Sequence, residues 1–257
     1  MKMKMKALAA ALALSAAGSA NAAIDNMSTG NGELFFSIRD NVNLTSYVLD
    51  MNVTMDAWDQ YTNQTWAADA TLTSFLGAGS GNYSWAVMGG DSATGGTVGG
   101  LRFLTTAAAG QAANWANETN GGLDQYGIME TSYLVGANAA IATGTTGNSA
   151  TFANTDSGYF DTNMDFWFNN SPMNAAAAGI GGTQSFYFGT NGNVTTNPIL
   201  ANQKIVVTEQ LGSFTLASNG DLTYATPVPA AVWLLGSALV GLVGVARRRD
   251  DAEVLTA

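Results

Sequence analysis

The chain has 257 residues with no cysteine and no histidine, and its 19 acidic residues outnumber its 9 basic ones, which gives a formal net charge of −10. The missing residue types exclude zinc fingers, thiol nucleophiles, Ser-His-Asp triads and histidine-ligated metals. Between Ala23 and Thr226, three basic residues stand against sixteen acidic ones, and nucleic acid is a disfavoured partner because its binding needs clustered lysine and arginine.

The N-terminus has the features of a secretory signal peptide. Three lysines precede an apolar run from Ala7 to Ala17, and Ala20 and Ala22 supply a small-x-small cleavage pattern. We expect the Sec translocon to export the chain and signal peptidase to remove residues 1–22, so that the mature chain begins near Ala23. An uncleaved anchor is the disfavoured alternative, because the apolar run is shorter than the roughly 20 residues of a membrane span.

Short β-prone runs begin the exported part. Glu33–Arg39 and Leu44–Asp50 flank an Asp-Asn turn and predict a first hairpin. Asn82–Met88 and Leu101–Thr105 predict two further strands, joined by the glycine-rich loop Gly89–Gly100. This loop lacks the Lys-Ser/Thr of a phosphate-binding loop and the spacing of a dinucleotide fingerprint, so we interpret it as a connection.

Helical patterns are fewer. Apolar residues three positions apart predict one or two helical turns within Met55–Trp66, and Thr71–Leu76 predicts another short element. The alanine-rich segment Ala107–Asn120, which we expect to end at Gly121-Gly122, is the strongest helix prediction. The pattern leaves two later segments, Ile128–Val135 and Ala137–Ala142, ambiguous.

The second half of the ectodomain predicts more strands, at Met164–Phe168, Ser185–Phe188, Lys204–Thr208 and Ser213–Leu216. Asn219-Gly220, placed before Leu222–Tyr224, is the strongest hairpin signal in the chain. Many short strands at this spacing predict a mainly β ectodomain over residues 23–225, a β-sandwich or jelly roll with one or two short helices.

One stretch resembles the start of a calcium-binding loop. Asp161, Asn163 and Asp165 alternate, but Phe166 and Pro172 stand where an EF-hand needs glycine and glutamate, so an EF-hand is rejected. A calcium site of another type stays open as an alternative to the favoured interpretation, which is turn chemistry.

Aromatic and acidic residues suggest one more chemistry. Asp56 and Asp59, beside Trp58 and Tyr61, imitate a glycosidase site, but catalytic carboxylates are usually distant in sequence. Exposed tryptophans could stack on sugars, although tryptophans more often lie in the core; the candidates are Trp58, Trp66, Trp85, Trp115 and Trp167. We therefore predict no catalytic residue, no metal and no cofactor, and expect that the protein is not an enzyme.

The C-terminal segment combines a proline motif, an apolar run and a basic cluster. Pro227-Val228-Pro229 precedes an uncharged run from Ala230 to Ala246 that is long enough for a transmembrane helix. Arg247, Arg248 and Arg249 would hold its far end in the cytoplasm, with residues 250–257 as a cytoplasmic tail. A buried core helix is disfavoured because such a helix would not normally end in three arginines.

In order and spacing, residues 226–249 resemble a PEP-CTERM sorting signal, with Pro227-Val228-Pro229 in place of Pro-Glu-Pro. The segment Gly32–Met55 is also similar to the start of several ectodomains with this signal, a similarity that brings no known activity. The family is Gram-negative and associated with exopolysaccharide. The resemblance implies that an exosortase cuts near the prolines, after a transient stay in the inner membrane, and releases the ectodomain or transfers it to the surface.

We therefore expect an exported surface or extracellular-matrix protein with a structural or adhesive role in a polysaccharide-rich biofilm, with exopolysaccharide as a candidate partner. Two alternatives stay open. One is a carbohydrate-binding module or glycan-acting protein. The other is a periplasmic protein anchored by an uncleaved C-terminal helix.

Overall fold

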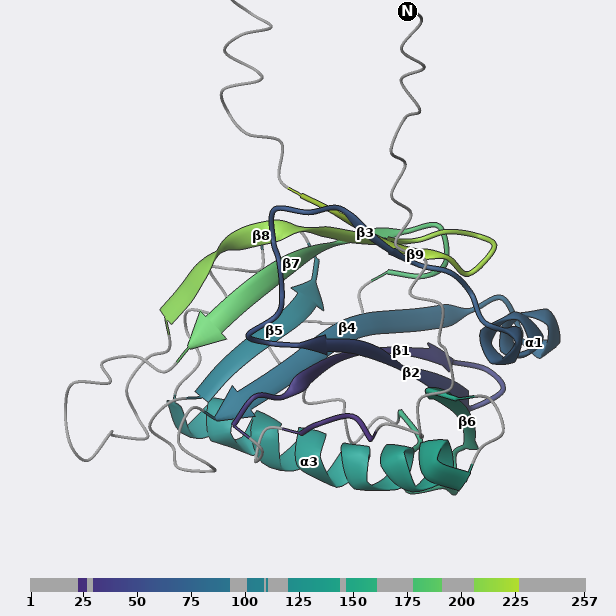
Figure 1. The fold of residues 1–257 in the computed structure, drawn as a ribbon. Coiled ribbons are helices and arrows are strands. Elements are labelled where there is room, and N and C mark those ends of the chain that lie inside the picture. Colours follow the sequence, from purple (N-terminus) through teal and green to yellow (C-terminus); the bar gives the residue numbers. More distant parts are fainter. Residues whose placement is uncertain are drawn as a thin grey trace, which may run out of the picture.

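The computed structural model describes residues 23–26, 30–92, 101–108, 110, 120–143, 147–160, 178–190 and 206–226. Within these ranges nine strands form one antiparallel sheet in the order β3-β9-β8-β7-β5-β4-β1-β2-β6 (Figure 1). The strands are β1 Glu33–Asp40, β2 Thr45–Thr54, β3 Gln64–Trp66, β4 Tyr83–Ser92, β5 Leu101–Ala107, β6 Ser149–Ala153, β7 Thr183–Thr190, β8 Val206–Leu216 and β9 Leu222–Ala225. The helices are α1 Ala70–Ala78 and α3 Asn120–Thr143.

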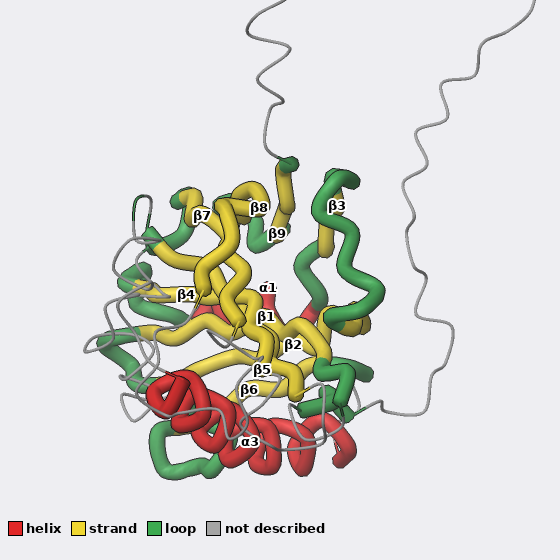
Figure 2. The backbone as a smooth tube through the Cα atoms, turned by 90° about the vertical axis from the view of Figure 1, so that its left-hand side faces the viewer, coloured by secondary structure: helices red, strands yellow, loops and turns green. Residues whose placement is uncertain are grey.

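The sheet curls until its two arms face each other. Strands β3, β9, β8 and β7 form the upper arm and β4, β1, β2 and β6 the lower one, with α3 beneath the lower arm (Figures 1 and 2). Buried side chains from both arms fill the space between them, including Phe36, Trp85, Phe186, Phe214 and Tyr224. A second buried cluster lies between the lower arm and α3, so the lower arm is covered on both faces.

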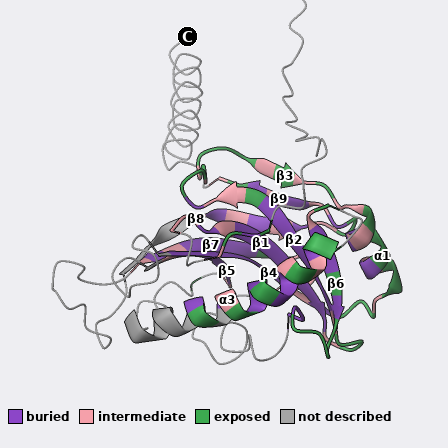
Figure 3. Ribbon diagram, turned by 60° about the horizontal axis from the view of Figure 1, so that its bottom comes forward, coloured by how far each residue is buried: buried purple, intermediate pink, exposed green. Residues whose placement is uncertain are grey.

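This double coverage explains why β1 is buried from Leu34 to Asp40 (Figure 3). Side chains alternate between the two faces of a strand. Leu34, Phe36 and Ile38 belong to the cluster between the arms, whereas Phe35 packs on Tyr133 of α3 with ring centroids 5.7 Å apart. The next residue facing α3, Ser37, shares a 2.9 Å hydrogen bond with the Tyr133 hydroxyl.

Two irregularities interrupt the ladder. The register of β1 with β2 shifts between Leu34 and Phe35, opposite Asn52, whose φ is +53°. The register of β7 with β8 shifts around Tyr187, next to Gly212 with φ of +149°. Extra residues of this kind bend and twist a strand, and they account for part of the curl.

Most strand predictions are confirmed. The first hairpin is formed by β1 and β2. The predicted strand Asn82–Met88 lies in β4 except for its first residue. Leu101–Thr105 lies in β5, and Ser185–Phe188 lies in β7. The hairpin at Asn219-Gly220 joins β8 to β9, and Gly220 has φ of +91°. Of the Lys204–Thr208 prediction, residues 206–208 belong to β8, while Met164–Phe168 lies outside the described residues.

The helix prediction over Met55–Trp66 is wrong, and the one over Ala107–Asn120 is wrong at both of its ends. Residues 55–57 form a turn and Gln64–Trp66 is strand β3, because Trp58 is drawn into the aromatic cluster of Phe214 and Tyr224. Ala107 ends β5 and Asn120 begins α3, so the two glycines expected to end a helix lie inside one; residues 111–119 lie outside the described ranges. The two segments left ambiguous, within residues 128–142, are helical because their buried stripe of Tyr133, Leu134, Ala137 and Ile141 packs on the sheet.

The mainly β prediction is confirmed, but the described strands form one curled sheet rather than the two sheets of a sandwich or jelly roll. Thr71–Leu76 lies within the short helix α1, whereas α3 has 24 residues and is not short. Among the described residues, no helix has both the length and the apolar character that a membrane crossing needs. The predicted signal peptide, proline motif and transmembrane helix lie outside the described residues.

Candidate functional site

A surface groove of about 680 Å³ lies between α1 and the sheet edge made by β2 and β6. One wall is formed by α1 and Gly79, and the other by the start of β2, the residue Asn43 before it, and β6. The lining residues are Asn43, Thr45, Ala70, Thr71, Ser74, Phe75, Ala78, Gly79, Thr151, Phe152 and Ala153. None of these side chains is charged, which is notable in a chain with a net charge of −10.

Asp69 fixes the first turn of α1 at one end of the groove. Its Oδ1 accepts a 2.6 Å hydrogen bond from the backbone N–H of Leu72, as an N-cap does. Its Oδ2 accepts hydrogen bonds from the Tyr47 hydroxyl of β2, at 3.0 Å, and from the Ser149 hydroxyl of β6, at 2.5 Å. Burial and the Asp69 charge raise the pKa of Tyr47 well above its usual value, so Tyr47 remains a donor.

Asp40 holds the other end of α1. Its carboxylate accepts hydrogen bonds of 2.6 Å from both the backbone N–H and the hydroxyl of Ser80, just after the helix. The backbone N–H groups of Val42 and Asn43 donate to the same carboxylate at 2.9 Å. Burial alone would raise the pKa of Asp40, but these hydrogen bonds outweigh it and lower the pKa to about 2. Both carboxylates near the groove therefore hold α1 in place.

The polar side chains of the groove carry hydroxyls, apart from Asn43, whose amide N–H donates to Asp40 at 3.1 Å. Among the described residues, the hydroxyls of Thr45, Thr71 and Thr151 have no protein partner, and Ser74 donates to the carbonyl of Ala70 at 2.8 Å. The phenyl groups of Phe75 and Phe152 are almost fully buried and add a small apolar area. Such a lining suits a neutral ligand with hydroxyl groups rather than an ion.

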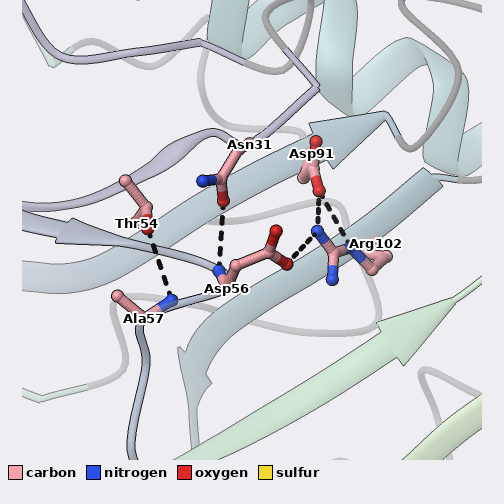
Figure 4. A network of polar contacts seen from close by, with 6 residues as sticks. All are labelled: Asn31, Thr54, Asp56, Ala57, Asp91 and Arg102. Carbon is pink, nitrogen blue, oxygen red and sulfur yellow. Dashed lines mark hydrogen bonds and ion pairs between the residues drawn. The ribbon is translucent and has the colours of Figure 1, made fainter.

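A second polar network lies at the ends of β4 and β5 (Figure 4). Arg102 pairs with Asp91 of β4, with Nε 2.9 Å from Oδ2, and its Nη2 lies 2.9 Å from Oδ1 of Asp56. The backbone N–H of Asp56 donates to the Asn31 side chain at 3.1 Å. The network fastens the turn after β2 to the sheet, and we interpret it as structural.

Two buried carboxyl groups have strongly shifted pKa values. Burial raises the pKa of Glu130 on α3 to about 8, helped by the Asp91 charge and opposed by a 3.0 Å hydrogen bond from the Gly90 N–H. Burial likewise raises the pKa of Asp50 to about 7, against a 2.7 Å bond from the Asn52 N–H. Shifted carboxyls mark many functional sites, but neither lines the groove, and no three acidic side chains among the described residues are arranged to hold a metal.

The glycosidase-like carboxylates do not form a site. Asp56 pairs with Arg102, whereas Asp59 accepts hydrogen bonds from the Thr62 hydroxyl at 2.5 Å and the Tyr61 N–H at 2.8 Å within its own turn. Trp58 faces the core, and Tyr61 is 82% exposed. The two carboxylates thus point to different partners.

The described tryptophans do not form an exposed platform. Trp85 is fully buried and donates to the carbonyl of Gly179 at 2.8 Å, and the half-buried Trp58 and Trp66 pack against the cluster between the arms. Trp115 and Trp167 lie outside the described residues, as do the calcium-like segment from Asp161 to Pro172 and the glycines at 95–100. Asp156, before that segment, accepts a 2.8 Å bond from the Ala153 N–H.

The sequence analysis missed the groove itself. Asp69 directly before Thr71–Leu76 is an N-cap signal and could have located α1. The contact of Asp40 with Ser80, 40 residues later, and the meeting of α1 with β6 depend on chain contacts that local patterns do not encode. No protein-family model, curated protein or solved structure matches the chain, so the function has to be inferred from its own residues.

Proposed function

We propose that the chain is an exported surface or extracellular-matrix protein, sorted by an exosortase-type enzyme, with a structural or adhesive role in a polysaccharide-rich biofilm. Its partners would be the Sec translocon, signal peptidase, the sorting enzyme and, transiently, the inner membrane. The curled sheet would serve as a sandwich-like ectodomain, since its two arms enclose one core.

The observation that supports this proposal best is the packing of the described residues next to the two expected cleavage sites. Ile24, one residue beyond the expected mature start at Ala23, is buried, and its backbone exchanges two hydrogen bonds with the side chain of Asn138 at 2.8 and 3.0 Å. At the other end β9 finishes at Ala225, and the Thr226 N–H donates to Asn63 at 2.9 Å. Described residues next to both expected cleavage sites thus belong to the packed ectodomain, as the proposal requires.

The proposal is tested by intact-mass and C-terminal peptide analysis of the protein from its own cells, with and without the exosortase-type enzyme. We expect a mature form that begins near Ala23 and ends near Pro227 to Pro229 only when that enzyme is present. A chain that still ends at Ala257 and stays with the inner membrane would reject sorting and favour the alternative of an anchored periplasmic protein.

The groove favours a second candidate function, binding of a neutral glycan chain. Its uncharged walls, and three threonine hydroxyls without a partner among the described residues, are the features that a neutral polysaccharide would use. Affinity electrophoresis in gels that contain dextran, galactomannan or a cellulose ether should show retardation of the protein.

A matched pair of variants tests whether the groove causes the retardation. Ser74→Tyr should fill the groove and abolish retardation. Thr73→Tyr should leave it unchanged, because Thr73 is equally exposed on α1 and makes the same kind of backbone hydrogen bond but does not line the groove. Equal behaviour of the two variants, or no retardation of the wild type in any of the three gels, would remove this candidate.

A further inference from the structure

From Ile128 onwards, the described exposed side chains of α3 are unusual for a surface helix because none of them is charged. Its exposed residues follow each other at spacings of four and three, and we call Ile128, Ser132, Val135, Ala139 and Ala142 the α3 stripe. Ile128 and Val135 are 51% and 65% exposed. From Ile128 to Thr143 the sequence contains one charged residue, Glu130, and it is buried.

The hydroxyls on this face do not make it polar. Ser132 donates to the carbonyl of Ile128 at 2.9 Å, and Thr143 donates to the carbonyl of Ala139 at 3.1 Å. Each hydroxyl thus bonds to its own helix one turn back rather than pointing its hydrogen outward. Burial of this face in an interface would therefore leave few polar groups without a hydrogen bond.

The spacing is that of a helix-pairing seam. Apolar residues that alternate four and three apart form the a and d positions of a heptad, and they place knobs along one straight stripe. The stripe is nearly symmetric about Val135: Ile128 and Ala142 lie seven residues to either side, and Ser132 and Ala139 lie three before and four after. In an antiparallel pair of identical helices with Val135 facing its own copy, Ile128 would oppose Ala142, and Ser132 would lie within one residue, about 1.5 Å, of Ala139.

We propose that the α3 stripe binds the α3 stripe of a second copy of this chain, as an antiparallel, two-fold symmetric helix pair. Ile128 then meets the small Ala142, whereas a parallel in-register pair would place Ile128 against its own copy, and the helix dipoles oppose each other. Charge also favours this face. Two chains of net charge −10 repel each other, and the uncharged stripe lets them approach with the least repulsion.

The strength of the pair follows from its size. The stripe spans 15 residues, about 21 Å of helix at 1.5 Å per residue, and buries less than the roughly 800 Å² per partner of a standard interface. We therefore expect a dimer that dissociates on dilution. This inference is independent of the proposed sorting and of the groove.

The absence of cysteine from the chain allows a direct test on the full-length protein. Val135→Cys places one thiol at the two-fold axis, while Val42→Cys places one in the turn between β1 and β2, and the native valines have closely matched exposure of 65% and 62%. Under mild oxidation Val135→Cys should form disulfide dimers at least roughly tenfold faster, because pairing raises the effective thiol concentration. Equal rates for the two variants would overturn the proposal.

A mixing experiment tests the orientation. Differently tagged Ile128→Cys and Ala142→Cys chains should cross-link to each other more than to themselves. Preferential cross-linking of Ile128→Cys to itself would reject the antiparallel arrangement.

Sedimentation velocity over a concentration series gives an independent readout. The wild type should show a concentration-dependent dimer that Val135→Glu loses and Val42→Glu keeps. A wild type that stays monomeric, with Val135→Glu instead losing binding to phosphatidylcholine vesicles, would assign the face to lipid and overturn the proposal.

Discussion

At the scale of single residues, Glu130 is a carboxyl group that the fold removes from water. It lies 1% exposed beneath Gly90, and its Oε2 has no hydrogen-bonding partner among the described residues. Burial raises its pKa to about 8 from 4.5, so the folded protein holds a proton here that the unfolded chain releases above about pH 4.5. The stabilisation from Glu130 is therefore complete below pH 4.5 and is lost as the pH rises through about 8.

We predict that Glu130→Gln removes most of the decrease in unfolding free energy that Glu130 causes as the pH rises. Glutamine keeps the shape and an acceptor for the Gly90 N–H but has no proton to release. At about 1.4 kcal/mol per pKa unit, the wild type would lose at most about 5 kcal/mol of unfolding free energy between pH 4.5 and 8 through this residue. Urea unfolding at pH 5, 7 and 9 measures the loss in both proteins.

Asp59→Asn is the control for this experiment. Hydrogen bonds from Thr62 and Tyr61 lower the pKa of Asp59, so its stabilisation is lost towards acid and its replacement should not flatten the alkaline decline. If Glu130→Gln loses stability between pH 5 and 9 as steeply as the wild type, Glu130 is not the responsible group.

Single residues differ in how much of their role can be predicted from the sequence. Asp69 and Gly220 act on neighbouring residues, so their roles as helix cap and turn residue follow from local patterns. Glu130, in contrast, owes its raised pKa to burial against parts of the chain far away in sequence, such as Gly90, 40 residues before it. Nothing in the sequence around it distinguishes Glu130 from an ordinary exposed glutamate of a helix.

At the scale of elements, two glycines in the two helices should respond to alanine in opposite ways. A Cβ on Gly136 of α3 would collide with the backbone of Ser157 and lie 2.5 Å from the nitrogen of Gly158, whereas a Cβ on Gly77 of α1 would meet nothing within 4 Å. We predict that Gly136→Ala destabilises by about 1–3 kcal/mol through overpacking, and that Gly77→Ala stabilises by about 0.5–1 kcal/mol through helix propensity.

Chemical denaturation of both variants measures this difference. Each is the other's control, because both make the same chemical change inside a helix. If Gly136→Ala proves neutral, the turn at residues 156–158 yields easily and does not fix the position of α3.

Strands were easier to predict than helices for a physical reason. Alternation and an Asn-Gly turn are local signals, and β1, β2, β4 and the β8–β9 hairpin carry them. Helix α3 contains Gly121, Gly122, Gly127 and Gly136, which lower its intrinsic helix propensity. Its buried stripe and the close approach at Gly136 compensate, and these tertiary contacts are invisible in the sequence.

At the scale of the whole molecule, Trp58 ties the segment between β2 and β3 to the upper arm. Its ring lies 5.3 Å from Phe186, 5.9 Å from Phe214 and 4.7 Å from Tyr224. Its Nε1 is buried without a hydrogen-bonding partner among the described residues. The ring therefore stabilises the fold by packing and not by its N–H group.

We predict that Trp58→Ala costs about 3 kcal/mol, at the low end for such truncations because the side chain is half-buried. Trp58→Phe should cost less than about 1.5 kcal/mol, since it keeps an aromatic ring and loses no hydrogen bond. Thermal unfolding followed by circular dichroism tests both. A Trp58→Phe cost as large as that of Trp58→Ala would mean that the N–H has a partner after all.

The order of the strands also bears on how the chain folds as it is made. Strand β3 lies in the first third of the sequence but pairs with β9, near the end of the described chain. Likewise, the Tyr224 hydroxyl donates a hydrogen bond to the carbonyl of Gln60, 164 residues earlier. Contacts of such high sequence separation form late and slow folding. A chain synthesised from its N-terminus cannot complete the core between the arms until Tyr224 has been made. Until then the aromatic side chains of the first half are exposed and can bind chaperones or other nascent chains.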